Sequence, residues 1–189
     1  MSNRIVFDGW IEVICGPMFS GKTEELLKRL DKIKYSKEKY IVFKPSIDTR
    51  STTEIVSRWN NSNPAIEIKK ASDILEILKN TKEKFKVIAI DEVQFLGDDI
   101  IDVCQELTRK GHHLILAGLD KNFKAEPFGC ISKVLAIADS VTKLSASCTK
   151  CGIRATFSKR IVQDNHNEIY IGDKEVYEAR CYQHYWNKD

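Results

Sequence analysis

No part of this 189-residue sequence is apolar over the roughly 18 consecutive residues that a transmembrane helix needs. Its first residues lack the basic and apolar segments of a secretory signal peptide. An excess of charge is missing too, because 30 Lys and Arg stand against 27 Asp and Glu. The resulting net charge of +3 is too small to indicate a nucleic-acid-binding surface. We therefore expect a cytoplasmic protein that binds neither a membrane nor nucleic acid.

The sequence gives no sign of a disulfide framework, although it contains six cysteines. Disulfides are rare in cytoplasmic proteins, so these cysteines need another explanation. Cys15, Cys104 and Cys130 lie in or beside apolar segments, where a cysteine acts as a small buried hydrophobic residue. The remaining three lie in the last quarter of the chain, close to a histidine.

Short apolar runs alternate with segments of helical periodicity along the chain. The predicted strands cover residues 11–15, 41–43, 87–90, 114–117 and 141–144. The predicted helices cover residues 24–34, 71–79 and 98–110. This alternation is typical of βαβ units and predicts an α/β fold, a mostly parallel sheet flanked by helices. Residues 45–64 are rich in Ser, Thr, Asn and Asp, so we expect a long loop there that could cover a ligand.

A P-loop follows the first predicted strand and leads into the first predicted helix. The pattern G-x-x-x-x-G-K-[ST] is formed by Gly16, Pro17, Met18, Phe19, Ser20, Gly21, Lys22 and Thr23. Backbone N–H groups of such a loop bind a phosphate chain, and the start of the helix favours anions. Lys22 would reach the β- and γ-phosphates, and the Thr23 hydroxyl would ligate Mg²⁺. The pattern predicts a nucleoside triphosphate as ligand.

Two acids, Asp91 and Glu92, follow the predicted strand over residues 87–90. In P-loop proteins an acid at the tip of a strand holds Mg²⁺ directly or through water, and we assign this role to Asp91. We expect its strand to lie directly beside the P-loop strand. Glu92 is placed to accept a proton from an attacking hydroxyl or water. Two solvated acids at a strand end are the alternative interpretation.

A metal site is predicted near the end of the chain. Its candidate ligands come from a C-x₂-C and a C-x₂-H pair and are Cys148, Cys151, Cys181 and His184. Three thiolates and one imidazole suit a tetrahedral Zn²⁺ ion, and four protein ligands leave no open position for catalysis. We therefore expect a structural zinc. The composition changes near Ser147, which predicts a P-loop domain over residues 1–147 and a zinc-binding domain over 148–189.

Together these motifs resemble the cytosolic-type, or type II, thymidine kinase family. The matching segments are 16–23, Lys-Pro-Ser-Ile-Asp-Thr-Arg at 44–50, Ile-Asp-Glu-Val-Gln-Phe at 90–95, Ala-Gly-Leu-Asp at 117–120, Phe123, Pro-Phe-Gly at 127–129 and the two zinc pairs. They occur in the family's order, and the resemblance covers nearly the whole chain. It implies a RecA-like P-loop fold with a small zinc-binding module that carries a lasso loop.

The resemblance also implies an activity and the residues that serve it. The family transfers the γ-phosphoryl group of ATP, with Mg²⁺, to the 5′-hydroxyl of thymidine, and deoxyuridine is a candidate second acceptor. Glu92 matches the family's proton acceptor. The positions that match the ATP and magnesium site are the P-loop residues together with Asp48, Thr49, Arg50, Asp91 and Gln94. The positions that match the nucleoside site are Leu119, Phe123, Phe128, Glu168, Ile169, Tyr170, Ile171, Gly172 and Tyr177.

The family typically forms homotetramers and is inhibited by dTTP, and the resemblance implies both for this chain. Three positions depart from the family pattern: Arg58, Ser158 and Asp173. Ser158 replaces a common threonine and so lacks one methyl group near the expected base pocket. A different class of function stays open on the motifs alone. That alternative is an ATP-hydrolysing switch whose zinc ribbon binds nucleic acid or protein.

Overall fold

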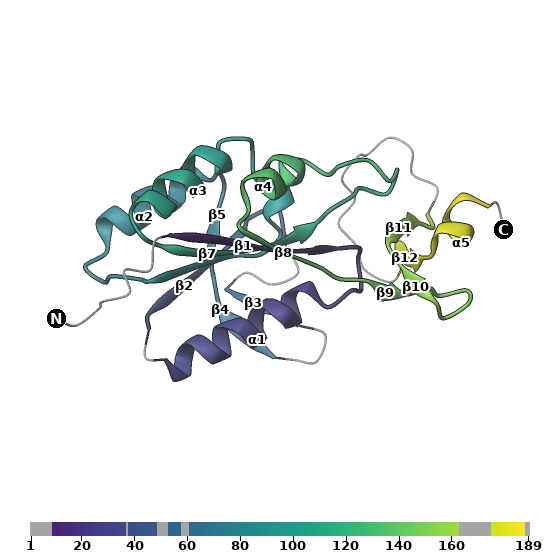
Figure 1. Ribbon diagram of the computed structural model, residues 1–189, viewed down its shortest axis with the longest axis horizontal. Coiled ribbons are helices and arrows are strands. Elements are labelled where there is room, and N and C mark those ends of the chain that lie inside the picture. Colours follow the sequence, from purple (N-terminus) through teal and green to yellow (C-terminus); the bar gives the residue numbers. More distant parts are fainter. Residues whose placement is uncertain (1–8, 37, 49–52, 58–60, 163–174, 188–189) are drawn as a thin grey trace.

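The computed structural model describes residues 9–36, 38–48, 53–57, 61–162 and 175–187. Within them lies a six-stranded sheet with the order β5-β2-β6-β7-β1-β8 (Figure 1). Its strands are β1 Trp10–Gly16, β2 Tyr40–Pro45, β5 Ile66–Ile68, β6 Val87–Ile90, β7 His113–Leu119 and β8 Ser140–Lys143. Every neighbouring pair in this sheet is parallel, which confirms the predicted α/β class.

Helices cover both faces of the sheet. The helices that flank the sheet are α1 Lys22–Tyr35, α2 Ser72–Asn80, α3 Ile100–Arg109 and α4 Ile131–Ile137. Figure 1 places α1 alone on one face and the other three on the opposite face. Successive side chains of a strand point to opposite faces of the sheet. Val13 therefore belongs to the core between the sheet and α2, α3 and α4, and Ile14 to the core between the sheet and α1. Both side chains are fully buried.

Strand β6, which the two acids Asp91 and Glu92 follow, does not lie beside the P-loop strand β1. We expected β6 next to β1, and that expectation was wrong, because β7 pairs with both and separates them. Parallel strands are joined by crossovers, so a strand that comes later in the chain can be inserted between two earlier ones. The periodicity of the sequence can predict a strand but not the neighbours of that strand in the sheet.

Residues 45–64 are not one long loop. They include a small antiparallel hairpin of β3 Glu54–Val56 and β4 Ser62–Pro64. Ile55 is buried in the core below α1, and the Asn63 side chain donates a hydrogen bond to the Tyr40 hydroxyl at 2.8 Å. Strands of three residues are too short to produce a periodic signal, and their polar composition resembles that of a loop. The same applies to β5, which sequence periodicity also missed.

The C-terminal elements form a small unit of their own beyond the carboxyl ends of β1 and β7 (Figure 1). We call it the Cys/His module. It consists of β9 Ala146–Ser147, β10 Arg154–Ala155, β11 Phe157–Arg160, β12 Tyr177–Arg180 and α5 Tyr182–Trp186. Two antiparallel pairs, β9 with β10 and β11 with β12, surround a small apolar cluster whose described members include Cys148, Ala155, Ala179 and Cys181. Across the described residues, no helix is long and apolar enough to cross a bilayer.

The buried face of α1 provides a test of the fold. Leu30 is fully buried, whereas Lys32 on the same helix is exposed. Leu30→Ala should lower the free energy of unfolding by about 2–5 kcal/mol, because it removes apolar contacts and leaves a cavity. Lys32→Ala should change it by no more than about 0.5 kcal/mol. Urea denaturation followed by circular dichroism would measure both, and equal effects would contradict the placement of α1.

Candidate functional site

The P-loop joins the end of β1 to the start of α1. Gly16 has a φ of 150°, and a Cβ there would lie 2.6 Å from the Leu144 carbonyl oxygen, so no larger residue fits. Gly21, with a φ of 81°, caps α1 in the left-handed region that glycine adopts without steric cost. Lys22 is buried and its ammonium donates to the Pro17 carbonyl oxygen at 2.8 Å. The lysine side chain therefore folds back over the loop, where a P-loop binds phosphate.

A hydrogen bond connects the P-loop helix to the end of β6. The Thr23 hydroxyl donates to Oδ2 of Asp91 at 2.8 Å, and the other carboxylate oxygen accepts the Glu92 backbone N–H at 3.0 Å. Asp91 is only 4% exposed. The two residues predicted to hold Mg²⁺ thus meet although the P-loop strand β1 and the strand β6 are not neighbours. A hydroxyl and a carboxylate oxygen are hard ligands of the kind that Mg²⁺ prefers.

Glu92 is held in an unusual backbone conformation. Its φ of 51° and ψ of 39° lie in the left-handed region, which residues with a side chain adopt at an energetic cost. Its carboxylate accepts a hydrogen bond of 2.6 Å from the Gln94 amide. The side-chain oxygen of Gln94, Oε1, in turn accepts a hydrogen bond of 3.0 Å from the Leu119 backbone N–H. This contact links the end of β6 to the end of β7. Backbone strain of this kind is found mainly at functional sites.

The side chain of Gln94 fits in its buried position because residue 118 is a glycine. Gln94 is 2% exposed, and a Cβ on Gly118 would lie 2.6 Å from its side-chain oxygen. The bridge from Glu92 to Leu119 therefore depends on this glycine in β7. Gln94 was predicted from the resemblance alone, and the role of Gly118 carried no signal in the sequence.

The residues predicted for the nucleoside pocket do not all have the same surroundings. Phe123 and Tyr177 are brought together by Arg160, whose guanidinium lies 3.7 Å from the Phe123 ring centroid and donates to the Tyr177 hydroxyl at 3.1 Å. Phe128 instead packs edge-on against Phe95, with ring centroids 5.5 Å apart, and borders the core. Sequence reasoning gave no role to Arg160, although a cation over the face of an aromatic ring is a common recognition element.

Several predicted residues lie outside the described part of the chain. They are Thr49, Arg50, Glu168, Ile169, Tyr170, Ile171 and Gly172, together with the departures Arg58 and Asp173. Asp48 is described and buried, and its carbonyl oxygen accepts a hydrogen bond of 3.1 Å from the ammonium of Lys44. Lys44, at the end of β2, is itself only 1% exposed. A buried lysine that anchors the segment before Thr49 was not predicted.

The four predicted metal ligands form one cluster. The ligand atoms of Cys148, Cys151, Cys181 and His184 all lie within 4.8 Å of one another. The Cys151 and Cys181 sulfurs are 3.8 Å apart, and His184 Nδ1 lies 3.3 Å from the Cys181 sulfur and 3.6 Å from the Cys148 sulfur. A tetrahedral ion with Zn–S bonds of about 2.3 Å separates its ligands by roughly 3.3 to 3.8 Å. The cluster can therefore hold a metal ion of this size.

The protein also prepares one of these thiols for metal binding. Burial raises the pKa of the Cys148 thiol, but backbone N–H groups of Cys181, Lys150 and Cys151 donate to the sulfur and lower the pKa to about 6. The thiolate is the form of cysteine that binds metals.

The three cysteines outside the cluster differ from Cys148. Cys15, Cys104 and Cys130 are buried, and burial raises the pKa of each thiol, which confirms that they serve as hydrophobic residues.

Comparisons with known proteins agree with this arrangement. A profile of the thymidine kinase family matches residues 9–185. This chain belongs to the thymidine kinase family. The thymidine kinase of Ureaplasma urealyticum serovar 10 is 49% identical over 184 residues, which cover 94% of this chain and 82% of that protein. The thymidine kinase of Mycoplasma genitalium is 47% identical over 179 residues, with 94% and 83% covered.

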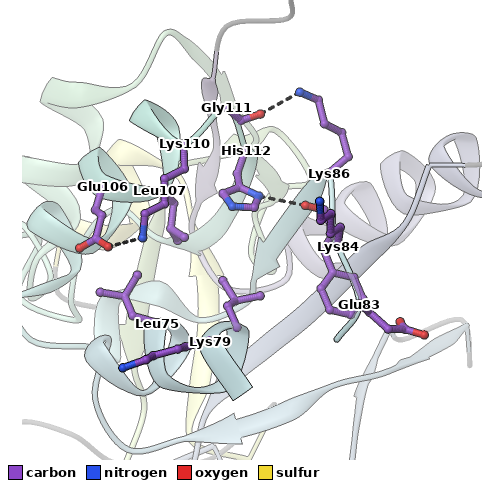
Figure 2. A pocket seen from close by; sticks show the side chains of 12 residues that line it. Leu75, Lys79, Glu83, Lys84, Lys86, Glu106, Leu107, Lys110, Gly111 and His112 are labelled. Atoms are coloured by element: carbon purple, nitrogen blue, oxygen red, sulfur yellow. Dashed lines mark hydrogen bonds and ion pairs between the residues drawn. The ribbon is translucent and has the colours of Figure 1, made fainter. Parts of the chain in front are cut away.

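A hollow elsewhere in this family member is separate from the P-loop. It has a volume of about 620 Å³ and lies among α2, α3 and the segments that precede β6 and β7 (Figure 2). In its wall, Nδ1 of His112 donates to the Phe85 carbonyl oxygen at 2.9 Å, and the Lys86 ammonium donates to the Gly111 carbonyl oxygen. These residues stand at the amino ends of the strands. The P-loop and both acids stand at the carboxyl ends, where parallel sheets bind their ligands.

The ligand cluster makes a direct prediction about metal content. Purified protein should contain one zinc ion per chain, and Cys181→Ser should lose it, because this sulfur contacts two other ligands of the cluster. Cys130→Ala is the matched control, since Cys130 lies outside the cluster and should leave the zinc in place. Elemental analysis by mass spectrometry would measure the content. Equal zinc in the Cys181 variant and the control would show that the cluster is not the metal site.

Proposed function

We propose that this chain transfers the γ-phosphoryl group of ATP to the 5′-hydroxyl of thymidine and gives thymidine 5′-monophosphate. Deoxyuridine is the second acceptor that we expect. The observation that carries this proposal is the hydrogen bond between Thr23 and Asp91, which brings the P-loop and the strand-end acids together in a chain of the thymidine kinase family. Such convergence is what phosphoryl transfer requires of a P-loop protein.

The donor site would be built on the P-loop. Residues Gly16 to Thr23 bind the phosphates of ATP, and Lys22 stabilises the negative charge on the γ-phosphoryl group. Thr23 and Asp91 would hold the Mg²⁺ that accompanies ATP, and this ion would neutralise phosphate charge. Gln94 supports this site through Glu92. The segment Asp48-Thr49-Arg50 supplies a second contact with the phosphates, with Arg50 close to the transferred group.

The acceptor is activated by Glu92. The carboxylate takes the proton of the thymidine 5′-hydroxyl while the 5′-oxygen bonds to the γ-phosphorus and the bond from that phosphorus to ADP breaks. Glu92 is 7% exposed, and the Gln94 amide fixes its carboxylate. A base in a fixed position within a site closed to water favours transfer to the nucleoside over hydrolysis.

The nucleoside would lie between the carboxyl ends of the sheet and the Cys/His module. Leu119, Phe123 and Phe128 line the thymine pocket, and the lasso segment, to which residues 168–172 and Tyr177 are assigned, closes it. Contacts from the module to the pocket support this arrangement, because the Tyr185 hydroxyl donates to the Phe123 carbonyl oxygen at 2.6 Å. The zinc ion in the cluster would be structural. We also propose the division into a P-loop domain, 1–147, and a zinc-binding lasso domain, 148–189.

The wider setting of the enzyme follows from the same proposal. We expect a cytoplasmic homotetramer that supplies thymidine monophosphate for DNA synthesis by nucleotide salvage. We expect dTTP, the end product of that route, to inhibit it. We expect neither nucleic acid nor a membrane as partner.

The proposal is tested by asking which compound makes the protein consume ATP. With Mg²⁺, ATP consumption should depend on thymidine, and the phosphorylated product should be thymidine 5′-monophosphate on chromatography. Consumption that DNA stimulates and nucleosides do not would overturn the proposal. That result would favour an ATP-driven switch with a zinc ribbon.

Replacement of the base gives a sharper prediction. Glu92→Gln keeps the shape of the side chain but cannot accept the proton, so kcat for thymidine should fall by about 10²- to 10⁴-fold. The dissociation constant of Mg·ATP should stay within about twofold, because Glu92 does not belong to the P-loop. Glu76→Gln on the exposed face of α2 is the matched control and should leave both quantities unchanged. Near-normal turnover of the Glu92 variant would refute its assignment as base.

A further inference from the structure

The P-loop and the Cys/His module touch at two consecutive residues. The backbone N–H of Met18 donates to the Ser158 hydroxyl at 2.9 Å, across 140 positions of sequence. The side chain of the next residue, Phe19, packs against the module's core, which includes Cys148 and Cys181. The loop that binds phosphate is thus in direct contact with the core that contains two metal ligands.

Phe19 needs such a support. Its φ of 68° places an aromatic residue in the left-handed region, where the side chain crowds the backbone. A residue keeps this conformation only when its surroundings hold it there. Two contacts from the Cys/His module reach this turn: the Ser158 hydroxyl at the Met18 N–H and the module core at the Phe19 side chain. Hydrogen bonds within the loop, from the Ser20 hydroxyl and the Lys22 ammonium to the Pro17 carbonyl oxygen, add to them. We conclude that the shape of the P-loop depends in part on contacts with the Cys/His module.

Ser158 is in turn fixed by the strand that leads to a metal ligand. It lies in β11, is 5% exposed, and is paired with Ala179 in β12. Ala179 stands two residues before Cys181, and its carbonyl oxygen accepts the N–H of Thr149, which follows Cys148 directly. A metal ion bound by both Cys148 and Cys181 would therefore hold together the two segments that this hydrogen bond connects, the one after Cys148 and strand β12. Loss of the ion would free the strand that holds Ser158.

We propose that Ser158 and Phe19 couple the metal cluster to the P-loop, so that the module positions the loop for binding the phosphates of ATP. Ser158 acts here as a positioning residue, because it touches the backbone of the loop and not the phosphate. The inference rests on the proposed function for the identity of the ligand. Coupling of this kind is reciprocal: nucleotide in the P-loop strengthens metal retention by the same factor as metal strengthens nucleotide binding.

The Met18 hydrogen bond gives the first test. Ser158→Ala leaves the Met18 N–H without its acceptor and should weaken Mg·ATP binding about three- to tenfold. Ser158→Thr keeps the hydroxyl and should bind Mg·ATP within about twofold of the original protein. Ser132→Ala, an exposed serine on α4, is the matched control. The measurement is isothermal titration calorimetry without thymidine, so that any contact between Ser158 and the nucleoside has no effect.

Zinc removal gives the second test and addresses the coupling itself. Chelation should weaken Mg·ATP binding by the original protein, with zinc content measured in the same samples. In Ser158→Ala the further loss on chelation should be smaller, since one link is already missing. Added Mg·ATP should slow zinc release to a chelator in the original protein more than in the alanine variant.

Two results would overturn the inference. One is Mg·ATP affinity that is the same in the zinc-loaded Ser158→Ala and original proteins. The other is an equal effect of chelation on both proteins. Either result, found together with thymidine-dependent ATP consumption, rejects the coupling and leaves the proposed function intact. Absence of thymidine-dependent consumption while the coupling persists would reject the proposed function alone.

Discussion

The hydrogen bond between Thr23 and Asp91 is the interaction on which the site depends. Neighbouring strands lie about 4.8 Å apart, and β7 is inserted between β1 and β6, so the ends of the two strands cannot meet directly. Helix α1 closes this gap, because it begins at the P-loop and places Thr23 over the end of β6. Both partners need their present positions for the P-loop and the acids to form one site. The order of the strands is thus a condition of the chemistry.

A second set of contacts connects the two acids to the residues of the proposed nucleoside pocket. Glu92 takes up a left-handed backbone, and Gln94 connects its carboxylate to the N–H of Leu119. Gly118 leaves space for this bridge in β7. Because β7 also separates β1 from β6, one strand both spaces the donor elements and supports the predicted acceptor pocket. The Cys/His module completes the arrangement, with Arg160 between two aromatic residues on one side and Ser158 against the P-loop on the other.

The sequence predicted the features that depend on local pattern. The P-loop, the parallel class of the sheet and the Cys₃His cluster follow from short spacings and apolar periodicity. In the structure the loop joins a strand to a helix, the six-stranded sheet is parallel, and the four ligand atoms lie together. Features that depend on contacts distant in sequence were missed. The insertion of β7 is set by packing of the whole sheet, and Ile55 sits in a strand too short to show a period. The bond from Ser158 to Met18 spans 140 positions, and no spacing rule encodes it.

A double-mutant cycle on Thr23 and Asp91 tests the account most directly. Thr23→Val removes the hydroxyl with little change of volume, and Asp91→Asn removes the charge. For thymidine-dependent phosphoryl transfer, measured as kcat/KM for ATP, we predict that the double variant loses less than the sum of the single variants, with a coupling energy of about 1–3 kcal/mol. Losses that add to within about 0.5 kcal/mol would show that the two residues act independently. That result would contradict a single site assembled across β7.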